Sequence, residues 1–405
     1  MKAIKCGMLF TAKDETVQKD MVILVKENRI EKVLPVAEAG DLSDYEIIDL
    51  SDKFVMPGLI DSHVHVNMNG EPDSMGQMAY TTIGALTLKS LKNAQDDLMA
   101  GFTTIRDEGA GGFSDVAVRD AINSGLVFGP RMMVSGVSIG TTGGHGDTHY
   151  NPYITDGNPF GKIIDSPDEA RKAARYTLKY GADQIKLMAT GGVMSFGDEP
   201  GAPDMTYEEM KAAIDVAKSR GRISSAHAHG HEGIKAAIRA GITSIEHGMI
   251  MDDEAIDMMA EYGTYLIPTI IAANNIVQAG VSAGIADWAV RKAEEVLSTH
   301  KDGFQKCMAK GVKIGFGTDA ATPYNKHGEQ AREFALMNSF GMEPVKTLLA
   351  ATKVNSEMMQ MNDSIGSIEE GKLADIVAFG SNPIEDLTVM TKCEFIMKDG
   401  VVYKK

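Results

Sequence analysis

The sequence predicts an α/β protein: a TIM (β/α)8 barrel with a small β-sandwich domain formed by both chain termini. Through the middle of the chain, eight short apolar runs alternate with amphipathic stretches. The two ends share a different texture, rich in β-branched residues and turn signals. Polar residues gather where the apolar runs stop, and barrel enzymes hold their reactive groups at such strand ends. The alternation alone also fits a doubly wound open sheet.

Both ends of the chain have the pattern of short strands. Val22–Leu34 carries β-branched residues on both sides of a Lys-Glu-Asn turn. Near the other end, Lys398-Asp399-Gly400 separates two apolar runs, as a hairpin turn does. Because the termini of a domain often lie close together, one domain can use both ends. We therefore expect a β domain from residues 1–56 and 366–405, and a barrel from residues 57–365.

The middle of the chain alternates strand-like and helix-like segments. The expected strands are Phe54–Asp61, Phe102–Asp107, Arg131–Gly136, Asp183–Ala189, Arg222–His229, Thr243–Gly248, Thr264–Ile270 and Lys313–Ala320. The expected helices are Thr81–Met99, Asp115–Ile122, Asp168–Tyr180, Thr206–Arg220, Gly233–Arg239, Asp252–Tyr262 and Trp288–Lys310. Several begin at a capping residue such as Ser166 and end at a glycine such as Gly181.

Composition excludes several classes of protein. The 405 residues include 40 Lys and Arg against 56 Asp and Glu, a net charge of −16, which argues against a nucleic-acid binder. Three cysteines, far apart, fit a reducing compartment and exclude a disulfide scaffold. We expect a cytoplasmic protein with no membrane association, because no signal peptide is recognisable and no stretch approaches the ~20 apolar residues of a membrane span. The 26 methionines are interpreted as core residues.

Histidines and acids recur at the predicted strand ends. His63 and His65 are two apart, so a strand directs both imidazoles to one face. Imidazole is the commonest ligand for Zn²⁺ and similar metals, although this pair alone fits two hydrogen-bonded core histidines equally well. Further strands end in His227 with His229, in Glu246 with His247, and in Asp319. Their accumulation favours a metal site.

Lys186 lies within an apolar strand and must be paired or neutral, because an isolated buried ammonium is costly. One interpretation is a buried ion pair with Asp319 or Glu246. The other is a neutral amine that reacts with CO₂ to give a carbamate, whose two oxygens bridge two metal ions. The neighbouring metal-ligand candidates favour the carbamate.

With these residues, the chain resembles the amidohydrolase superfamily over essentially its whole length. Pro57–His65 is similar to the family's first-strand HxH motif, and Gly366–Val377 is similar to its C-terminal signature. The segments around His145, Lys186, His227 and Asp319 resemble the binuclear zinc dipeptidases related to imidazolonepropionase, which include Xaa-Pro dipeptidases and carboxypeptidases that release arginine or lysine.

The resemblance implies a binuclear centre in which N6-carboxylated Lys186 and a hydroxide bridge two Zn²⁺ or similar ions. Asp319 would take a proton from the attacking water and pass it to the leaving amine. His145 would donate to the developing oxyanion or the substrate carbonyl. It also implies a small-molecule substrate and a homo-oligomer. The implied ligands are His63, His65 and Asp319 for one metal and His227 and His247 for the other.

Other pocket residues are expected from their position alone. His229 faces as His227 does and is a candidate for the substrate's α-carboxylate, and the alternatives are a hydrogen bond that supports a metal ligand, or helix capping. Arg106 ends the second predicted strand and Tyr324 follows the last, so both could contact substrate. For a basic substrate residue, a buried acid is expected, and three candidates are open: Glu108, Asp147 and Glu329.

Other functions remain open at this point. The fold could act on a cyclic amide such as an imidazolone, or on a different N-acyl amino acid. A non-catalytic, amidohydrolase-like scaffold protein is a further alternative, although it is expected to have lost metal ligands. Gly136–Gly140 matches the GxSxG pattern of serine hydrolases, but that pattern requires a helix directly after Ser138, where the sequence predicts a loop.

Overall fold

The computed structural model describes residues 1–147 and 161–405 and divides the chain into two compact units. The first unit contains residues 1–61, 95–105 and 328–405. The second contains residues 62–94 and 106–327. The domain boundaries expected from the sequence follow the change in texture along the chain and stay a prediction.

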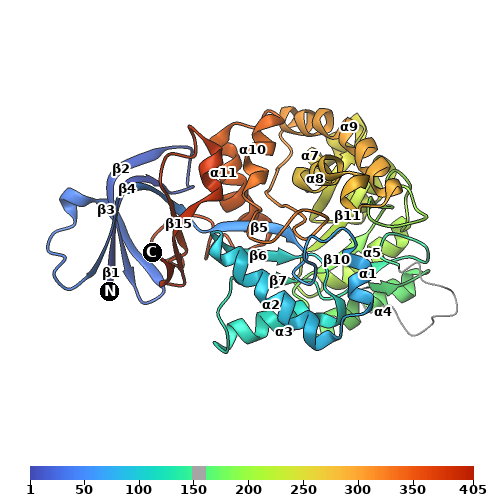
Figure 1. The fold of residues 1–405 in the computed structure, drawn as a ribbon, viewed down its shortest axis with the longest axis horizontal. Helices are drawn as coiled ribbons and strands as arrows, with labels where there is room; N and C mark the ends of the chain where they lie inside the picture. Colours follow the sequence, from blue (N-terminus) through green and yellow to red (C-terminus); the bar gives the residue numbers. More distant parts are fainter. Residues whose placement is uncertain (148–160) are drawn as a thin grey trace. The chain divides into compact units, whose positions relative to one another are not determined.

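The first unit is built on a seven-stranded sheet that combines both ends of the chain (Figure 1). Its strand order is β16-β15-β14-β4-β1-β2-β3. Strand β14 runs antiparallel to β4, with Ile376 opposite Pro57, so the last part of the chain pairs directly with the first. The strands are β1 (Lys2–Phe10), β2 (Val17–Lys26), β3 (Arg29–Pro35), β4 (Glu46–Pro57), β14 (Ile376–Phe379), β15 (Cys393–Lys398) and β16 (Val401–Lys404).

Turn chemistry and core packing explain this sheet. Asp399 and Gly400, between β15 and β16, both have positive φ angles, of 49° and 73°, as a two-residue hairpin turn requires. Buried residues from both chain ends, among them Ile23, Val55 and Phe395, form one apolar cluster. The expectation that both termini share a β domain is therefore met by one continuous sheet, while its layering as a sandwich stays a prediction.

The second unit contains a six-stranded sheet of order β13-β12-β11-β10-β8-β9, in which every pairing is parallel. From β10 to β13, neighbours in the sheet are neighbours in the chain, which is typical of repeated β/α units. These strands are β8 (Ser138–Gly140), β9 (Gly161–Ile163), β10 (Ile185–Met188), β11 (Ser224–Gly230), β12 (Ser244–Ile250) and β13 (Tyr265–Ile267). Three further strands pair in the order β5 (Leu59–Val64), β6 (Phe102–Asp107) and β7 (Arg131–Val134).

Residues 314–320 connect the parallel strands without forming a ladder of their own. Parallel bridges join Ile314 to Leu266 of β13, and Ala320 to Val64 of β5. Gly317 allows the close approach, because a Cβ there would lie 2.9 Å from the Cβ of His63. The expected strand Lys313–Ala320 therefore occupies its predicted place between β13 and β5 as an irregular extended segment.

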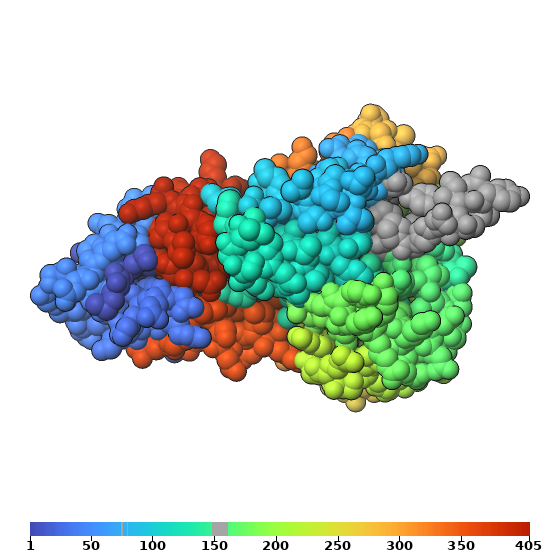
Figure 2. Space-filling view, turned by 90° about the horizontal axis from the view of Figure 1, so that it is seen from below, coloured from blue at the N-terminus to red at the C-terminus, as the bar shows by residue number. Residues whose placement is uncertain are grey.

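Helices follow most of the parallel strands. Successive helices pack against one another, α4 on α5, α5 on α6 and α6 on α7, and Figure 2 shows α4 and α5, in green, on the outer surface. Thr206 begins α5 with a capping box completed by Glu209. The helices are α1 (Ser74–Ala79), α2 (Ile83–Met99), α3 (Ser114–Asn123), α4 (Pro167–Lys179), α5 (Tyr207–Lys218), α6 (His231–Ala240), α7 (Asp253–Tyr262), α8 (Ile270–Ala279), α9 (Asp287–Lys310), α10 (Arg332–Ser339), α11 (Pro344–Leu349) and α12 (Asn355–Met358). Within the described ranges, no helix combines the length and apolar character of a membrane span.

The structure differs from the sequence prediction in how it divides two apolar runs. The first parallel strand begins at Leu59 instead of Phe54, because Phe54–Pro57 extends β4 of the terminal sheet. Helix α8 was not expected, since the apolar run from Ile270 fits a strand end as well as a helix. Thr269, with a left-handed φ of 45°, separates β13 from α8.

Candidate active site

Three predicted metal ligands converge in the second unit. His63 and His65 lie on and just after β5 and direct both imidazoles to one place. The Nε2 atoms of His63 and His65 lie 3.5 and 3.4 Å from Oδ1 of Asp319. One ligand atom from each residue lies within 4.8 Å of the others. This is a group that could hold a metal ion.

The other ring nitrogen of each imidazole has its own acceptor. His63 Nδ1 lies 2.8 Å from Oε2 of Glu246, and His65 Nδ1 lies 3.0 Å from the carbonyl oxygen of Gly109. Both acceptors require a proton on Nδ1, so each Nε2 faces Asp319 and is the nitrogen that can bind a metal ion once it carries no proton. Such outer partners fix the tautomer and orientation of metal-binding histidines.

The second pair of predicted ligands lies beside the first. The ring centroid of His247 is 4.9 Å from that of His63 and 4.8 Å from that of His227. His247 Nδ1 bonds Thr269 Oγ1 at 2.7 Å, and His227 Nε2 donates to the Gly191 carbonyl oxygen at 3.2 Å. His247, Thr269 and Asp319 all have left-handed φ angles, which for such residues indicates strain held at a functional place.

Lys186 is buried and pairs with an acid that the sequence did not indicate. Its Nζ lies 3.2 Å from Oε2 of Glu108, and both side chains are almost inaccessible. The ion-pair interpretation named Asp319 or Glu246 as the partner, so this detail was wrong. Glu108 also accepts hydrogen bonds from Gln184 and Ser225. Because Glu108 is fully engaged, it does not offer a free carboxylate to a basic substrate.

Arg106 supports the site from behind. Its guanidinium is fully buried and lies 2.8 Å from Glu246, 3.0 Å from Glu108 and 2.5 Å from the Ser62 carbonyl oxygen. Burial alone would raise the pKa of Glu246, but Arg106 and the hydrogen bond from His63 lower it to about 2. The expected substrate contact of Arg106 is therefore corrected: it positions Glu246, and through it His63.

The chemistry of these donors fits divalent cations. Burial lowers the pKa of His63, His227 and His247, so each ring is neutral and can act as a ligand. Burial alone would raise the pKa of Asp319, but the hydrogen bond with His65 and the nearby cationic groups hold it below its ordinary value. Burial alone would lower the pKa of His65, but the hydrogen bond with Asp319 raises it, and a metal ion would take the place of the proton that these two residues share. A carboxylate and imidazole nitrogens together are a donor set that suits zinc.

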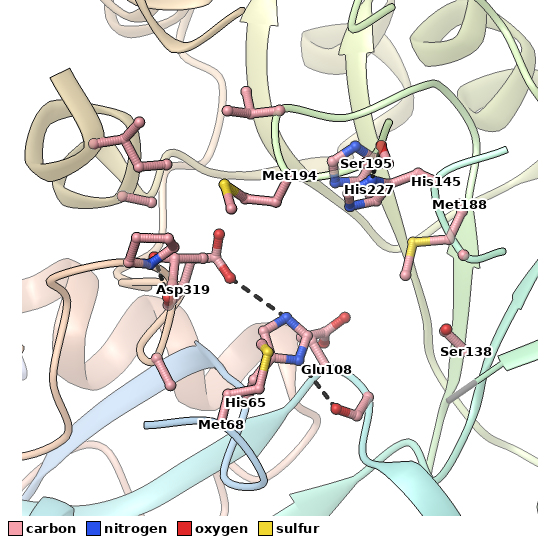
Figure 3. Close-up of a pocket in the computed structure, with 18 of the residues that line it drawn as sticks. His65, Met68, Glu108, Ser138, His145, Met188, Met194, Ser195, His227 and Asp319 are labelled. Atoms are coloured by element: carbon pink, nitrogen blue, oxygen red, sulfur yellow. Dashed lines mark hydrogen bonds and ion pairs between the residues drawn. The ribbon is translucent and has the colours of Figure 1, made fainter. Parts of the chain in front are cut away.

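A cavity of about 650 Å³ opens next to these residues. Most of its wall is apolar, with Phe196 and Trp288 in edge-to-face contact at 5.8 Å between ring centroids. Figure 3 shows Met188 and Met194 among the residues that line the cavity, together with His145 and His227. The 26 methionines were interpreted as core residues, yet five of them line this cavity: Met68, Met78, Met188, Met194 and Met249.

The structure places His145 and His229 in the cavity wall as expected. His145 stacks on His227 with 4.0 Å between ring centroids, and its Nδ1 lies 2.8 Å from Ser195 Oγ. His229 stacks on His247 at 5.1 Å. Its Nδ1 is buried and has no hydrogen-bond partner among the described residues, so it is available to a ligand.

Of the four other candidate residues, two line the cavity and two do not. Tyr324 is partly exposed and donates its hydroxyl to the Ala283 carbonyl oxygen at 2.6 Å, and it is not among the residues that line the cavity. Its expected substrate contact is therefore corrected to a loop-holding role. Glu329 is also outside the cavity wall, whereas Asp147 lies in the wall and accepts from the Gly143 backbone N–H. Ser138 lines the cavity too, but it begins β8 instead of preceding a helix, which removes the support for a serine nucleophile.

Sequence reasoning missed a polar cluster on the far side of His145. Ser195 and Asp198 lie in the long segment between β10 and α5, where no periodic pattern indicates a place in the fold. Lys292 carried a usable signal, because the amphipathic pattern of α9 places it on the buried face, where a lysine needs a partner. Its partner is Asp198, at 2.8 Å.

A pH-dependent stability follows from the buried imidazoles. Burial lowers the pKa of His229 to about 3, whereas the unfolded chain protonates near about 6.5. Neutral His229 therefore contributes stability that is fully present above pH ~6.5 and is lost as the pH falls towards about 3. We expect the melting temperature of chelator-treated protein to fall steeply between about pH 6.5 and 4, and less steeply in His229→Gln.

Thermal unfolding followed by circular dichroism at several pH values measures this effect. His231, two residues further on, has a side chain that is 44% exposed and provides the matched control in His231→Gln. Equal pH slopes for the two variants would contradict the assignment.

Comparison with known proteins identifies the class. The model of the Amidohydrolase family matches residues 54–404, so this chain belongs to the amidohydrolase family. The resemblance recognised in the sequence is confirmed, and the chain is an amide-bond hydrolase by family and by neighbours.

Three individual proteins show how similar this chain is to characterised amide hydrolases. A crystal structure of a Xaa-Pro dipeptidase with methionine bound in its active site is 37% identical, with a TM-score of 0.92 and full coverage of both chains. A prolidase complexed with N-methylphosphonate-L-proline is 29% identical, with a TM-score of 0.92 over 100% of this chain and 99% of that one. Ochratoxinase from Aspergillus niger is 32% identical over 377 residues, 86% of this chain and 75% of that protein. This similarity supports an α/β domain of the TIM-barrel kind.

Proposed function

We propose that this protein is a metal-dependent amidohydrolase that cleaves the peptide bond of a dipeptide, or the amide bond of an N-acyl amino acid, whose side chain is apolar. The observation that carries the proposal is the convergence of His63, His65 and Asp319 on one point at the edge of a largely apolar cavity. We further propose that the parallel strands close into a full eight-stranded barrel, since residues 314–320 bridge β13 and β5.

Two zinc or similar divalent ions fit the donor set. His63, His65 and Asp319 would hold one ion, and His227 and His247 would hold the other through their free ring nitrogens. When bound, such ions polarise the scissile carbonyl group and lower the pKa of a water molecule. Glu246 and the Gly109 carbonyl oxygen keep the Nδ1 protons of His63 and His65 away from the metal.

Lys186 would bridge the two ions as its carbamate. Carboxylation first requires loss of one proton from the ammonium group. The neutral amine nitrogen then bonds to CO₂ and loses a second proton, so the two released protons account for the change from a cation to an anion. The ion pair with Glu108 is then lost, but Glu108 keeps Arg106, Gln184 and Ser225 as partners. Buried Arg106 then remains to neutralise the acids beneath the site, which makes the exchange physically acceptable.

Asp319 is the proposed proton carrier. Its Oδ1 faces the two imidazoles, which leaves Oδ2 to accept a proton from the attacking water and return it to the leaving nitrogen. His229, with its buried and unpartnered Nδ1, is the proposed contact for the substrate carboxylate. The two residues stand on different strand ends and address different parts of one substrate.

The cavity favours an apolar substrate side chain. Methionine and aromatic residues fill irregular apolar shapes well and form much of the wall. The acids in the wall have partners: Glu108 pairs with Arg106 and accepts from Gln184 and Ser225, Asp73 caps α1, and Asp147 accepts from Gly143. A lysine or arginine side chain would lose its hydration there without gaining a free carboxylate. Two structural neighbours, a Xaa-Pro dipeptidase and a prolidase, add support for a proline on the amine side.

A dipeptide panel tests the proposal. Zinc-supplied protein is assayed with Met-Pro, Phe-Pro, Ala-Pro, Met-Arg and Met-Lys, together with N-acetylmethionine. We expect turnover of the substrates with apolar residues, and kcat/KM at least ~10-fold lower for the pairs ending in Arg or Lys, because burying an unpaired charge costs more than the ~1.4 kcal/mol of a tenfold change. No turnover of any member would refute the proposed function, and a preference for Arg or Lys would refute its apolar specificity.

A further inference from the structure

Three polar side chains, Ser195, Asp198 and Lys292, form a continuous chain behind His145. The hydroxyl of Ser195 lies between two partners, 2.8 Å from His145 Nδ1 and 2.6 Å from Asp198 Oδ2. Lys292 Nζ lies 2.8 Å from the other oxygen of Asp198. Figure 3 shows Ser195 next to His145 in the cavity wall. The side chains of Asp198 and Lys292 are only 5% and 2% exposed, so this geometry is held away from solvent.

The direction of these hydrogen bonds follows from a count of protons. Lys292 pairs with Asp198, and although burial alone would raise the pKa of Asp198, the hydrogen bonds from Lys292 and Ser195 and the charge of Lys292 lower it. An ionised carboxylate only accepts hydrogen bonds, so the single hydroxyl hydrogen of Ser195 points to Asp198. Ser195 Oγ can then only accept from His145, which requires the proton of that ring to be on Nδ1.

Local packing holds the ring in this orientation. A Cβ on Gly192 would lie 2.2 Å from His145 Nδ1, so only glycine lets the backbone approach this edge of the ring. Lys292 also donates to the carbonyl oxygens of Gly192 and Ser195, at 3.1 and 2.8 Å. The segment from Gly192 to Asp198 is therefore clamped against α9, and His145 has little freedom to turn its other nitrogen towards Ser195.

We propose that Ser195 and Asp198 are positioning residues that hold His145 as the Nδ1–H tautomer, so that Nε2 offers a lone pair to the substrate. A neutral ring in this form cannot donate to a carbonyl oxyanion, which revises the role expected for His145. It accepts instead, and the donor it suits is an N–H group on the acyl side of the substrate, such as an α-ammonium group. The substrate part of this inference rests on the proposed function, whereas the tautomer does not.

The positions of the ring proton of His145 and the hydroxyl hydrogen of Ser195 decide what each side chain can do. A neutral imidazole carries one ring proton, so the bond from Nδ1 to Ser195 leaves Nε2 without a hydrogen and decides what the ring can bind. The same proton count makes Ser195 a poor nucleophile, because the carboxylate that accepts its hydrogen is paired with Lys292 and is only a weak base. Ser195 therefore acts through His145 and not on the substrate.

Nitrogen NMR of the zinc-supplied full chain, labelled with ¹⁵N-histidine, tests the tautomer without any substrate. The His145 signals are assigned by their loss in His145→Asn. We expect a protonated Nδ1 and an unprotonated Nε2 in the parent protein. In Asp198→Asn the amide can donate to Ser195, whose hydrogen then turns to His145, and we expect the Nε2–H form to become populated. Ser195→Thr keeps the hydroxyl and should keep the Nδ1–H form.

An Nε2–H tautomer in the parent protein would overturn the proposal, as would an unchanged tautomer in both Asp198→Asn and Ser195→Ala. Ser138→Ala is the matched control, since Ser138 lines the same cavity and its hydroxyl forms no described bond to His145. It should leave the tautomer unchanged.

Kinetics with two substrates test the acceptor role. The parent protein should prefer Met-Pro over its analogue without the α-amino group by at least ~10-fold in kcat/KM, the value of one charge-assisted hydrogen bond. Asp198→Asn should reduce this preference several-fold. Ser195→Thr, which keeps the hydroxyl, should retain most of it. An undiminished preference in Asp198→Asn would contradict the acceptor role. Absence of all turnover would count against the proposed function, while the NMR result would still decide the tautomer.

Discussion

Asp319→Asn is expected to lower kcat/KM for Met-Pro by about a thousandfold, within the ~10²–10⁴ range typical of lost acid–base catalysis. The amide keeps the shape of the carboxylate, but it cannot accept a proton from water and return it to the leaving nitrogen. It also removes the charge that faces the Nε2 atoms of His63 and His65 at 3.5 and 3.4 Å, so affinity for one metal should fall as well. Steady-state kinetics at saturating zinc separates the catalytic loss from the loss of metal.

The control for this variant is Asp257→Asn, which changes an exposed aspartate on α7 that pairs with Lys310. It should keep full activity and metal content. If Asp319→Asn retained more than about a tenth of the parent rate, the proton-carrier role would be refuted, because acid–base catalysis contributes at least ~10²-fold.

Lys186→Ala is expected to lose metal and activity together. If the carbamate bridges two ions, its removal should reduce bound zinc from about two ions per chain to one or fewer and lower kcat/KM more than about a hundredfold, the upper loss seen even for outer partners of a metal. Elemental analysis of dialysed protein and dipeptide kinetics measure both effects. Incubation of the parent protein with ¹³C-bicarbonate should add one carbamate signal to its carbon NMR spectrum, and Lys186→Ala should lack it.

Lys235→Ala is the matched control for Lys186→Ala. Lys235 is also a mostly buried lysine with acidic partners, Asp252 and Glu254, but it lies on α6 outside the cavity wall. We expect it to lose some thermal stability and to keep zinc and activity. A Lys186→Ala protein with full zinc content and normal turnover would refute the bridging role and leave the Glu108 ion pair as the function of Lys186.

Much of this fold follows from local pattern. The 3.6-residue period and the caps of α4, α5 and α7 identify these helices within a few residues, because each helix buries one face only. Elements with apolar residues throughout were harder to separate. Ile270–Ala279 is a helix, and Phe54–Pro57 is part of the terminal sheet. Both conformations depend on contacts with residues far along the chain.

The candidate site was predictable where it lies on strands. His63, His65, Lys186, His227 and His247 could be placed because parallel strands bring their ends to one edge of a sheet. The partners of those residues could not be placed, since Glu108 meets Lys186 only after the barrel-like arrangement forms. The Ser195 and Asp198 pair lies in a long connection without periodicity, so only the structure brings it to His145.

These residues are proposed to hold the metal with which the protein hydrolyses an amide bond. Hydrolysis of Met-Pro during zinc titration of chelator-treated protein tests this most directly. We expect negligible turnover without metal and a rate that rises with bound zinc until about two ions per chain are present, as a binuclear hydrolase requires. A rate that is unchanged by chelation, with no metal found by elemental analysis, would contradict the account.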